Sequence, residues 1–207
     1  FYTEHTKDIN DELLFVRMKY DNVAKHIQLT AQSGSTRILE KMNRTYTREW
    51  YEERINRIKE LMPECSISSD IITGFCSETE EDHEATLSLM KWAEYEFSYM
   101  YFYSERPGTL AARKYEDDVP EEIKKRRLTE VIEAQHEVAK RKNKAQEGKV
   151  HRVLIESRSK KNPDEWMGRN EQNIKVIFPK ENYQKGEYVN VRIDRTTITS
   201  LIGVAVE

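Results

Sequence analysis

The stretch Ile-Ser-Ser-Asp-Ile-Ile at residues 67–72 is followed by Gly-Phe-Cys-Ser-Glu-Thr at residues 74–79, so that an apolar run breaks into a polar turn and then a helix pattern. The same junction occurs where residues 26–29 lead into Gln-Ser-Gly-Ser at residues 32–35, and where residues 99–103 lead into residues 104–109. In parallel α/β folds, the turns that follow the strands gather on one face, and ligands bind there. The repeated junction therefore predicts an α/β fold with a ligand site formed by three polar turns.

Composition narrows the class of protein. The chain has 207 residues, 34% of them charged, and no window approaches the ~18 apolar residues of a membrane span. Its two cysteines, Cys65 and Cys76, suggest no disulfide framework. We therefore expect a cytoplasmic protein with reduced thiols and no membrane partner. Because the first residue is Phe1, we also expect the chain to be a piece of a longer protein.

Strand and helix patterns alternate over residues 1 to about 103. A strand at Phe1–Glu4 precedes an amphipathic stretch at Ile9–Met18, Ser35 can cap a short helix, and a helix from about Thr47 stops at Pro63. Such alternation indicates parallel β-α units. About four units are present, too few to close a barrel of eight, so a partial (β/α) barrel with an exposed sheet edge is expected.

Two longer helices follow from their own signals. Thr79 to Asp82 has the form of a capping box, and a long connecting helix is expected over residues 120–147, with Gly148 ending it. That helix carries basic clusters at Lys124–Arg127 and Lys140–Lys144. We favour a solvated helix packed on the domain, and the alternative is contact with nucleic acid.

The pattern changes after residue 148 to short strands with turns. Residues 149–207 carry a local charge of +3 and the remainder −6, so the tail is the part that would prefer a polyanion. The spacing predicts a small antiparallel β-barrel of the kind that binds oligonucleotides. Its strands are expected at Val150–Glu156, Lys175–Phe178, Tyr188–Ile193 and Ser200–Val206, separated by Asn162–Asp164, Gly168 and Lys185-Gly186.

Each polar turn taken alone is only weak evidence for a ligand site. The turn at Gln32–Ser35 supplies an amide, two hydroxyls and a glycine for the ribose or carboxylate of a small cofactor, but it can equally be a helix cap. For Thr79 we favour the role of a plain N-cap. Arg106 could present a guanidinium to a phosphate or carboxylate, although an isolated turn of this kind is more often structural. The five histidines are scattered and indicate no metal site.

Taken together and in order, these motifs resemble the second half of a radical S-adenosylmethionine (SAM) methylthiotransferase. The residues concerned are His26–Ser35 with Leu39, Met42, Arg44 and Tyr46; Asp70–Phe75 with Glu78–Asp82; and Tyr103–Thr109 with Ala111 and Ala112. The tail is similar to the TRAM RNA-binding domain of these enzymes at Gly148-Lys149, Ser159–Lys161, Gly168–Asn170, Asn173, Phe178-Pro179, Gly186 and Ser200–Gly203. The resemblance divides the chain into residues 1–147, the end of a radical SAM barrel, and residues 148–207, a TRAM barrel.

The resemblance implies a tRNA-modifying enzyme of the branch that adds a 2-methylthio group to N(6)-isopentenyladenosine beside the anticodon. SAM and two 4Fe-4S clusters would serve the full-length enzyme, with tRNA and the upstream half of the same protein as partners and a monomer as its state. Motif matching assigns the cofactor side to Gln32, Ser33, Asp70, Gly74, Glu78 and Arg106. It assigns RNA contacts to Arg44, Lys160, Lys161 and Arg169, and no individual catalytic residue.

This chain also departs from the family pattern. The CxxxCxxC motif of the radical cluster and the cysteines of the auxiliary cluster are absent from it and are expected upstream, while Cys65 and Cys76 match neither set. Thr30 stands where the family commonly has proline. We therefore expect no cluster and no activity in the fragment itself. Two alternatives remain open: a non-catalytic RNA-binding protein, and a methylthiotransferase that acts on threonylcarbamoyladenosine.

Overall fold

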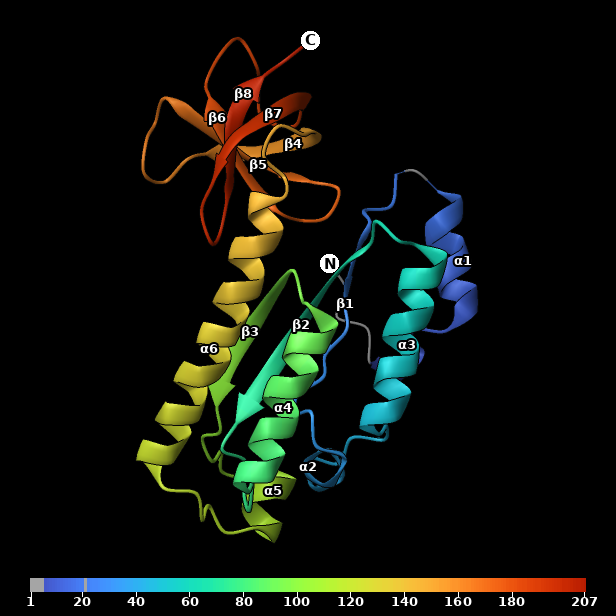
Figure 1. Ribbon diagram of the computed structural model, residues 1–207, viewed down its shortest axis with the longest axis vertical. Coiled ribbons are helices and arrows are strands. Elements are labelled where there is room, and N and C mark those ends of the chain that lie inside the picture. Colours follow the sequence, from blue (N-terminus) through green and yellow to red (C-terminus); the bar gives the residue numbers. More distant parts are fainter. Residues whose placement is uncertain (1–5, 21) are drawn as a thin grey trace.

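The computed structural model describes residues 6–20 and 22–207 as an α/β part followed by a closed β-barrel (Figure 1). The strand expected at Phe1–Glu4 lies outside the described residues. The elements of the α/β part are a 3-10 turn at Thr6–Asp8, α1 (Asp11–Lys19), β1 (His26–Gln28), α2 (Thr36–Lys41), α3 (Arg48–Leu61), β2 (Ser66–Thr73), α4 (Glu80–Ala93), β3 (Phe97–Phe102), α5 (Leu110–Lys114) and α6 (Glu121–Lys144). The barrel strands are β4 (Val150–Arg158), β5 (Glu165–Asn170), β6 (Lys175–Pro179), β7 (Tyr188–Thr196) and β8 (Leu201–Ala205).

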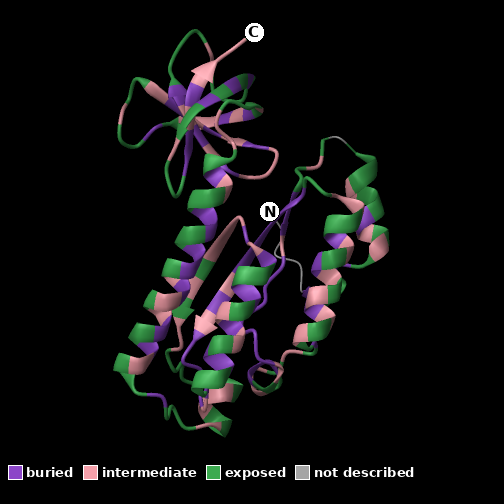
Figure 2. Cartoon of the chain, viewed as in Figure 1, coloured by how far each residue is buried: buried purple, intermediate pink, exposed green. Residues whose placement is uncertain are grey.

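The three strands of the α/β part form a parallel sheet in the order β1-β2-β3. Strands that neighbour each other in sequence order, with helices between them, are the arrangement of a (β/α) barrel wall. Ile67 and Ile71 of β2 share one hydrophobic core with residues of α3, α4 and α6, and buried residues line these facing surfaces (Figure 2). Because successive strand residues alternate in direction, Ser66, Ser68, Asp70 and Ile72 lie on the opposite face, which we call the inner face.

Local sequence signals set the helix starts. Ser35, Thr47 and Thr79 are the N-caps of α2, α3 and α4, and each hydroxyl accepts from a backbone N–H three residues later. The capping box at Thr79 and Asp82 is complete in both directions. One helix was missed: α5 begins at Leu110 behind the N-cap Thr109, so the third junction leads into a short helix before the long one.

The expectation for the basic clusters of α6 needs correction at two positions. Lys124 and Arg127 are buried rather than solvated: Lys124 Nζ lies 2.5 Å from Asp117 Oδ1, and Arg127 Nη1 lies 3.0 Å from Glu78 Oε1. Acidic partners also neutralise Arg126, Arg141, Lys142 and Lys144. These pairings support the packed helix and leave few cations of α6 free for nucleic acid.

The barrel differs from the sequence expectation by one strand. Gly168 was taken as a separator, but it lies inside β5, where a Cβ atom would stand 2.3 Å from the Leu154 carbonyl oxygen and 2.6 Å from Val153 Cγ1. Glycine is therefore required by close packing of β5 on β4 rather than by a turn. Four strand pairs are antiparallel, and the parallel pair β6 and β8 closes the barrel in the order β4-β5-β6-β8-β7.

The barrel sits at the end of the sheet where the strands begin, while β2 and β3 point away from it (Figure 1). The β5–β6 turn makes this contact: Ser66 Oγ donates to the Gln172 carbonyl at 2.7 Å, and Gln172 Nε2 donates to the Glu64 carbonyl at 3.4 Å. Asn143 near the end of α6 donates to the carbonyls of Thr197 and Ile198 at 2.8 and 3.0 Å. The three polar turns therefore lie at the end remote from the barrel. In the residues that the structure describes, no helix is both long and apolar enough to cross a membrane.

Candidate functional site

The first polar turn is tied to the middle strand of the sheet. The Gln32 N–H donates to the Asp70 carbonyl at 2.8 Å, and the Ile72 N–H donates to the Gln32 carbonyl at 2.9 Å. Gln32 has a φ of 68°, a conformation that few residues other than glycine adopt. Its side chain makes no hydrogen bond within the described residues. The left-handed backbone thus holds, in the turn after β1, a side-chain amide that no other described residue contacts by a hydrogen bond.

The next two residues of this turn pack against α4 instead of facing a ligand. Ser33 Oγ lies 3.3 Å from Thr86 Oγ1, and the Gly34 N–H donates to the same hydroxyl at 2.9 Å. A Cβ on Gly34 would stand 2.3 Å from the Ala85 carbonyl oxygen. The glycine is therefore needed for close approach of the turn to α4, and Ser33 holds that contact from a buried position.

The Asp70 carboxylate, on strand β2 ahead of the second turn, has only neutral hydrogen-bond partners among the described residues. Gln28 Nε2 and Thr30 Oγ1 donate to it at 3.2 and 3.1 Å. No Lys or Arg of the described residues pairs with this carboxylate. The cross-strand register pairs Asp70 with Tyr99 and Ile72 with Tyr101, so these side chains share the inner face.

The second turn is held from inside by a buried ion pair. Gly74 has a φ of 67°, and its N–H donates to Glu78 Oε1 at 2.7 Å. Arg127 of α6 donates to that same oxygen and to the Glu78 backbone carbonyl, each at 3.0 Å. Burial raises the pKa of Glu78, against the opposing effects of the Gly74 N–H and of Arg127. Glu78 and Gly74 therefore shape the turn, and the Glu78 side chain has its bonds inside the protein.

The third turn is open to solvent. Arg106 is exposed and has no carboxylate partner among the residues described here, while Thr109 donates to the Arg106 carbonyl at 2.9 Å and caps α5. Beside this turn lies a cavity of about 620 Å³, lined mainly by apolar groups and bordered by Ile72, Tyr101, Tyr103, Arg106 and Leu128. An exposed guanidinium thus borders an apolar cavity at the rim, the sheet end that carries the three polar turns.

Sequence reasoning missed the aromatic part of the inner face. Tyr99 and Tyr101 are 50% and 57% exposed although they belong to a sheet strand. The alternation of aromatic residues Phe97, Tyr99 and Tyr101 along one strand could have indicated a face of this kind. The buried Thr73 Oγ1 at the end of β2 also has no hydrogen-bond partner in the described residues. Tyr101 and Thr73, near the ends of β3 and β2, extend the rim beyond the residues that the sequence singled out, whereas Tyr99 lines a cavity toward the barrel.

The two cysteines do not fit an iron–sulfur cluster. Cys65 immediately precedes β2 and Cys76 follows it, so a whole strand at ~3.3 Å per residue separates them. Burial raises the pKa of Cys65 to about 11 and also raises the pKa of Cys76. Cluster ligands are thiolates close to one another, and these two are protonated thiols at opposite ends of a strand. In the residues that the structure describes, no group of three His, Cys, Asp or Glu residues could hold a metal ion.

The four candidate RNA contacts do not form one patch. Arg44 lies between α2 and α3, at the rim end of the α/β part, whereas Lys160 and Lys161 are exposed in the β4–β5 loop of the barrel. Arg169 lies on β5, where Nη1 donates to the Asn173 carbonyl at 2.8 Å and Nε lies 3.4 Å from Glu156. Any RNA that touched all four would have to extend along the molecule from the rim to the barrel.

Two family models match the chain. The TRAM domain matches residues 144–206, and the Radical SAM superfamily matches residues 6–90. The boundary of the TRAM match lies close to the end of α6 and to the predicted domain boundary at residue 148.

Curated relatives match over nearly the whole chain. Proteins named tRNA-2-methylthio-N(6)-dimethylallyladenosine synthase are 54% identical over 204 residues in Amoebophilus asiaticus, 50% over 206 in Flavobacterium johnsoniae and 49% over 203 in Bacteroides fragilis. The matches cover 98%, 100% and 98% of this chain but 42%, 43% and 44% of those proteins. The chain thus spans less than half the length of these relatives.

A solved structure supports the fold. Coproporphyrinogen III oxidase from Escherichia coli, described as a radical SAM enzyme, superimposes with a TM-score of 0.54 at 16% identity. The match covers 81% of this chain and 45% of that one. At this identity the likeness concerns the arrangement of strands and helices, and it agrees with a partial barrel wall.

Proposed function

We propose that this chain, which belongs to the radical SAM methylthiotransferases that end in a TRAM domain, is the C-terminal part of a tRNA-modifying enzyme. The enzyme would add a 2-methylthio group to N(6)-isopentenyladenosine next to the anticodon. The observation that carries the proposal is the identity of about half of all residues with the curated synthases across both parts of the chain. The three turns gathered on one rim support it independently.

The residues at the rim fit SAM by the chemistry of their free groups. The Asp70 carboxylate pairs with no Lys or Arg of residues 6–20 and 22–207, and it can accept hydrogen bonds from an ammonium or from ribose hydroxyls. The amide of Gln32 can bind adenine or ribose, and Arg106 can pair with the amino-acid carboxylate. Ser33, Gly74 and Glu78 would act through the backbone, because their bonds fix the shape of the first two turns.

The chemistry itself needs groups that this chain does not supply. Reduced 4Fe-4S clusters and bound SAM would supply the radical chemistry at C2 of the adenosine and the sulfur in the full-length enzyme. We propose that the cluster ligands lie in the upstream half of the same protein, because Cys65 and Cys76 do not fit the role. The task of the residues described here would be to bind and orient SAM and RNA. The fragment would accordingly be inactive alone, and the full-length enzyme a cytoplasmic monomer.

The RNA side of the proposal rests on the barrel and on candidate phosphate contacts. Lys160 and Lys161 are exposed cations of the barrel, and Arg169 and Arg44 are only partly exposed. Phosphate contacts make binding depend on salt, because each one releases counterions. Replacing Lys160, Lys161 and Arg169 by Ala should therefore weaken tRNA binding at low salt and flatten its salt dependence. Binding that is unaffected by the triple substitution would show that these residues are wrongly assigned.

The test of the enzyme begins with the full-length gene. Its upstream codons should encode a CxxxCxxC motif and a further set of cysteines, and the proposal fails if they do not. The full-length protein, reconstituted anaerobically with iron and sulfide, should cleave SAM. If it binds tRNA but takes up no iron and leaves SAM intact, the non-catalytic RNA-binding alternative is the correct one.

The modified nucleoside separates the two enzymatic readings. A strain without the gene should lose the 2-methylthio form of N(6)-isopentenyladenosine from its digested tRNA and accumulate the unthiolated form. Loss of the methylthio form of threonylcarbamoyladenosine instead would favour the second methylthiotransferase reading. The names of the curated relatives favour the first.

A further inference from the structure

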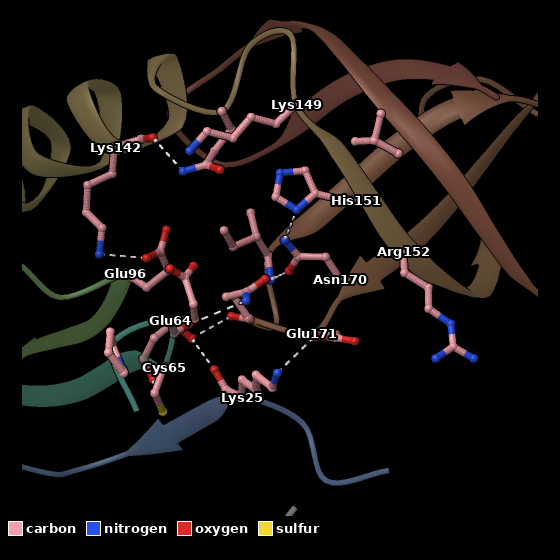
Figure 3. Close-up of a pocket in the computed structure, with 16 residues that line it drawn as sticks. Lys25, Glu64, Cys65, Glu96, Lys142, Lys149, His151, Arg152, Asn170 and Glu171 are labelled. Atoms are coloured by element: carbon pink, nitrogen blue, oxygen red, sulfur yellow. Dashed lines mark hydrogen bonds and ion pairs between the residues drawn. The ribbon is translucent and has the colours of Figure 1, made fainter. Parts of the chain in front are cut away.

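A polar groove runs along the junction between the β-barrel and the α/β part. One section of about 510 Å³ is bordered by Lys25, Glu96 and Lys142 on the α/β side and by Lys149, His151 and Arg152 on the barrel side (Figure 3). A second section of about 460 Å³ is bordered by residues 22–24, by Leu154 and by Tyr188. Arg152, Asn170 and Glu171 line both sections. The two cavities are therefore neighbouring parts of one groove over the outer face of β4, which we call the junction groove.

Most charges in the junction groove are already paired. Lys142 Nζ lies 2.6 Å from Glu96, Lys25 Nζ lies 4.0 Å from Glu171, and Arg169 lies 3.4 Å from Glu156. Lys149 and Arg152 are exposed and have no carboxylate partner in the described part of the chain, as their side chains in Figure 3 illustrate. The barrel wall of the groove thus keeps two cations for an external anion.

An exposed aromatic ring stands next to one of these cations. Tyr188 is 58% exposed, although it begins strand β7, and the Arg152 guanidinium lies 4.2 Å from the centre of its ring. The register pairs Leu154 with Tyr188 and Arg152 with Asn190, so the side chains of Arg152 and Tyr188 lie on the same, outer face of the barrel. A tyrosine ring beside a guanidinium is a surface on which an unpaired base can stack while its phosphate meets the cation.

We infer that the junction groove binds a single-stranded segment of the RNA substrate, with one base stacked on Tyr188 and the backbone held by Arg152 and Lys149. The inference rests on the proposed function, which makes RNA the substrate, and it adds a site on a face that the sequence did not indicate. The pattern of free charge also explains the choice of ligand. Two cations without a carboxylate partner in the described residues, beside an exposed aromatic ring, suit the phosphate and base of a nucleotide, whereas an acidic peptide would use the cations alone.

Fluorescence anisotropy of a labelled, transcribed substrate tRNA with the full-length protein over a salt series tests the site. Tyr188→Ala should raise the Kd by about tenfold, as expected for a lost stacking contact, without changing the slope of log Kd against log salt. Tyr188→Phe, which keeps the ring, should bind like the wild type. Arg152→Ala and Lys149→Ala should each raise the Kd and lower the salt slope by about one.

Controls make the result specific to the groove. Lys185→Ala removes an exposed lysine from the β6–β7 turn of the same barrel, outside the groove, and should have much less effect. Thermal unfolding of each variant should match the wild type, because Tyr188, Arg152 and Lys149 are exposed. Crosslinking by ultraviolet light should join tRNA to the peptide that contains Tyr188.

Two results would overturn the site. One is wild-type affinity in both Tyr188→Ala and Arg152→Ala while the wild type binds tRNA, and the other is an equal loss in Lys185→Ala, which would reveal attraction by general charge. Either result would leave the proposed function intact, because the wild-type protein would still bind tRNA. If the wild-type full-length protein fails to bind tRNA even at low salt, the proposed function itself is wrong, and the groove proposal falls with it.

Discussion

His26 lies on the inner face of the sheet with both ring nitrogens near serine hydroxyls. Nδ1 is 2.7 Å from Ser66 Oγ and Nε2 is 3.1 Å from Ser68 Oγ, and the ring stacks on Phe97. Burial, followed by the charges of Arg17 and Arg169, lowers the pKa of His26 to about 4. The neutral ring is therefore the form that the folded protein stabilises.

This pKa predicts how stability depends on pH. Between about pH 6.5 and 4 the unfolded chain protonates this histidine and the folded protein does not, so the free energy of unfolding should fall as pH falls through this range. The total change should be about 3 kcal/mol. Urea unfolding at several pH values should show a smaller decline in His26→Gln than in the wild type. Equal declines in the two proteins would mean that His26 titrates normally when folded.

Comparing alanine substitutions at Gly74 and Gly108 distinguishes the cost of backbone strain from the cost of a steric clash. Both have positive φ, 67° and 83°, but a Cβ on Gly74 would stand 2.4 Å from Lys124 Cγ, whereas a Cβ on Gly108 would meet nothing within 4 Å. Gly108→Ala should cost about 1 kcal/mol of strain. Gly74→Ala should cost more, ~3 kcal/mol, because Lys124 is buried and held by Asp117. Similar urea midpoints for the two variants would show that the turn can move away from α6.

At the scale of elements, α6 organises the second turn through the buried pair of Arg127 and Glu78. Their side chains are 5% and 1% exposed. Arg127→Met should destabilise the protein by ~3–5 kcal/mol, because a buried carboxylate loses its partner. Adding Glu78→Gln should restore part of this loss. Chemical denaturation of the single and double variants measures both effects.

The same helix provides a matched control for that substitution. Arg126 precedes Arg127 and pairs with Glu80 and Glu130, but its side chain is 43% exposed. Arg126→Met should cost less than about 1 kcal/mol, since surface ion pairs contribute little. Equal losses at positions 126 and 127 would contradict the special role given to the buried pair.

Elements that depend on neighbouring residues could be predicted, and those that depend on distant partners could not. The caps at Ser35 and Thr79 and the start of a helix near Thr47 were predicted because each cap bonds within its own first turn. Strand β5 was missed because Gly168 is required by the close approach of Leu154 on the neighbouring strand β4. Burial of Lys124 and Arg127 has the same origin, since α6 is packed against the second turn by contacts that no local pattern records.

For the candidate site, the position of the turns could be predicted, but the state of their side chains could not. The three turns were placed on one rim because strand ends of a parallel sheet must gather. The sequence did not indicate which side chains near that rim are free: Glu78 and Ser33 have their bonds inside the protein, whereas the Asp70 carboxylate has only neutral partners among the described residues. The junction groove was missed because Arg152 and Tyr188 meet only when β4 and β7 pair.

At the scale of the whole molecule, Asn143 joins α6 to the β7–β8 turn of the barrel. Its side chain donates to two carbonyls, those of Thr197 and Ile198. Asn143→Ala should leave these carbonyls unpaired, cost about 1–3 kcal/mol and speed hydrogen exchange at residues 197–200. Lys144→Ala, which removes an exposed side chain from the same helical turn, should leave exchange there unchanged. Unaltered exchange in Asn143→Ala would show that other contacts hold the turn.

The 24-residue length of α6 sets the rotation of the barrel about the helix axis as well as its distance from the rim. At about 1.5 Å and 100° per residue, the helix spans roughly 36 Å, and one added residue would swing the barrel through more than a quarter of a circle. Seven added residues would nearly restore the orientation of the barrel but would move the barrel about 10 Å farther from the rim. In the proposed enzyme, the number of residues in this one helix would therefore fix both the distance and the rotation between the RNA-binding barrel and the three polar turns.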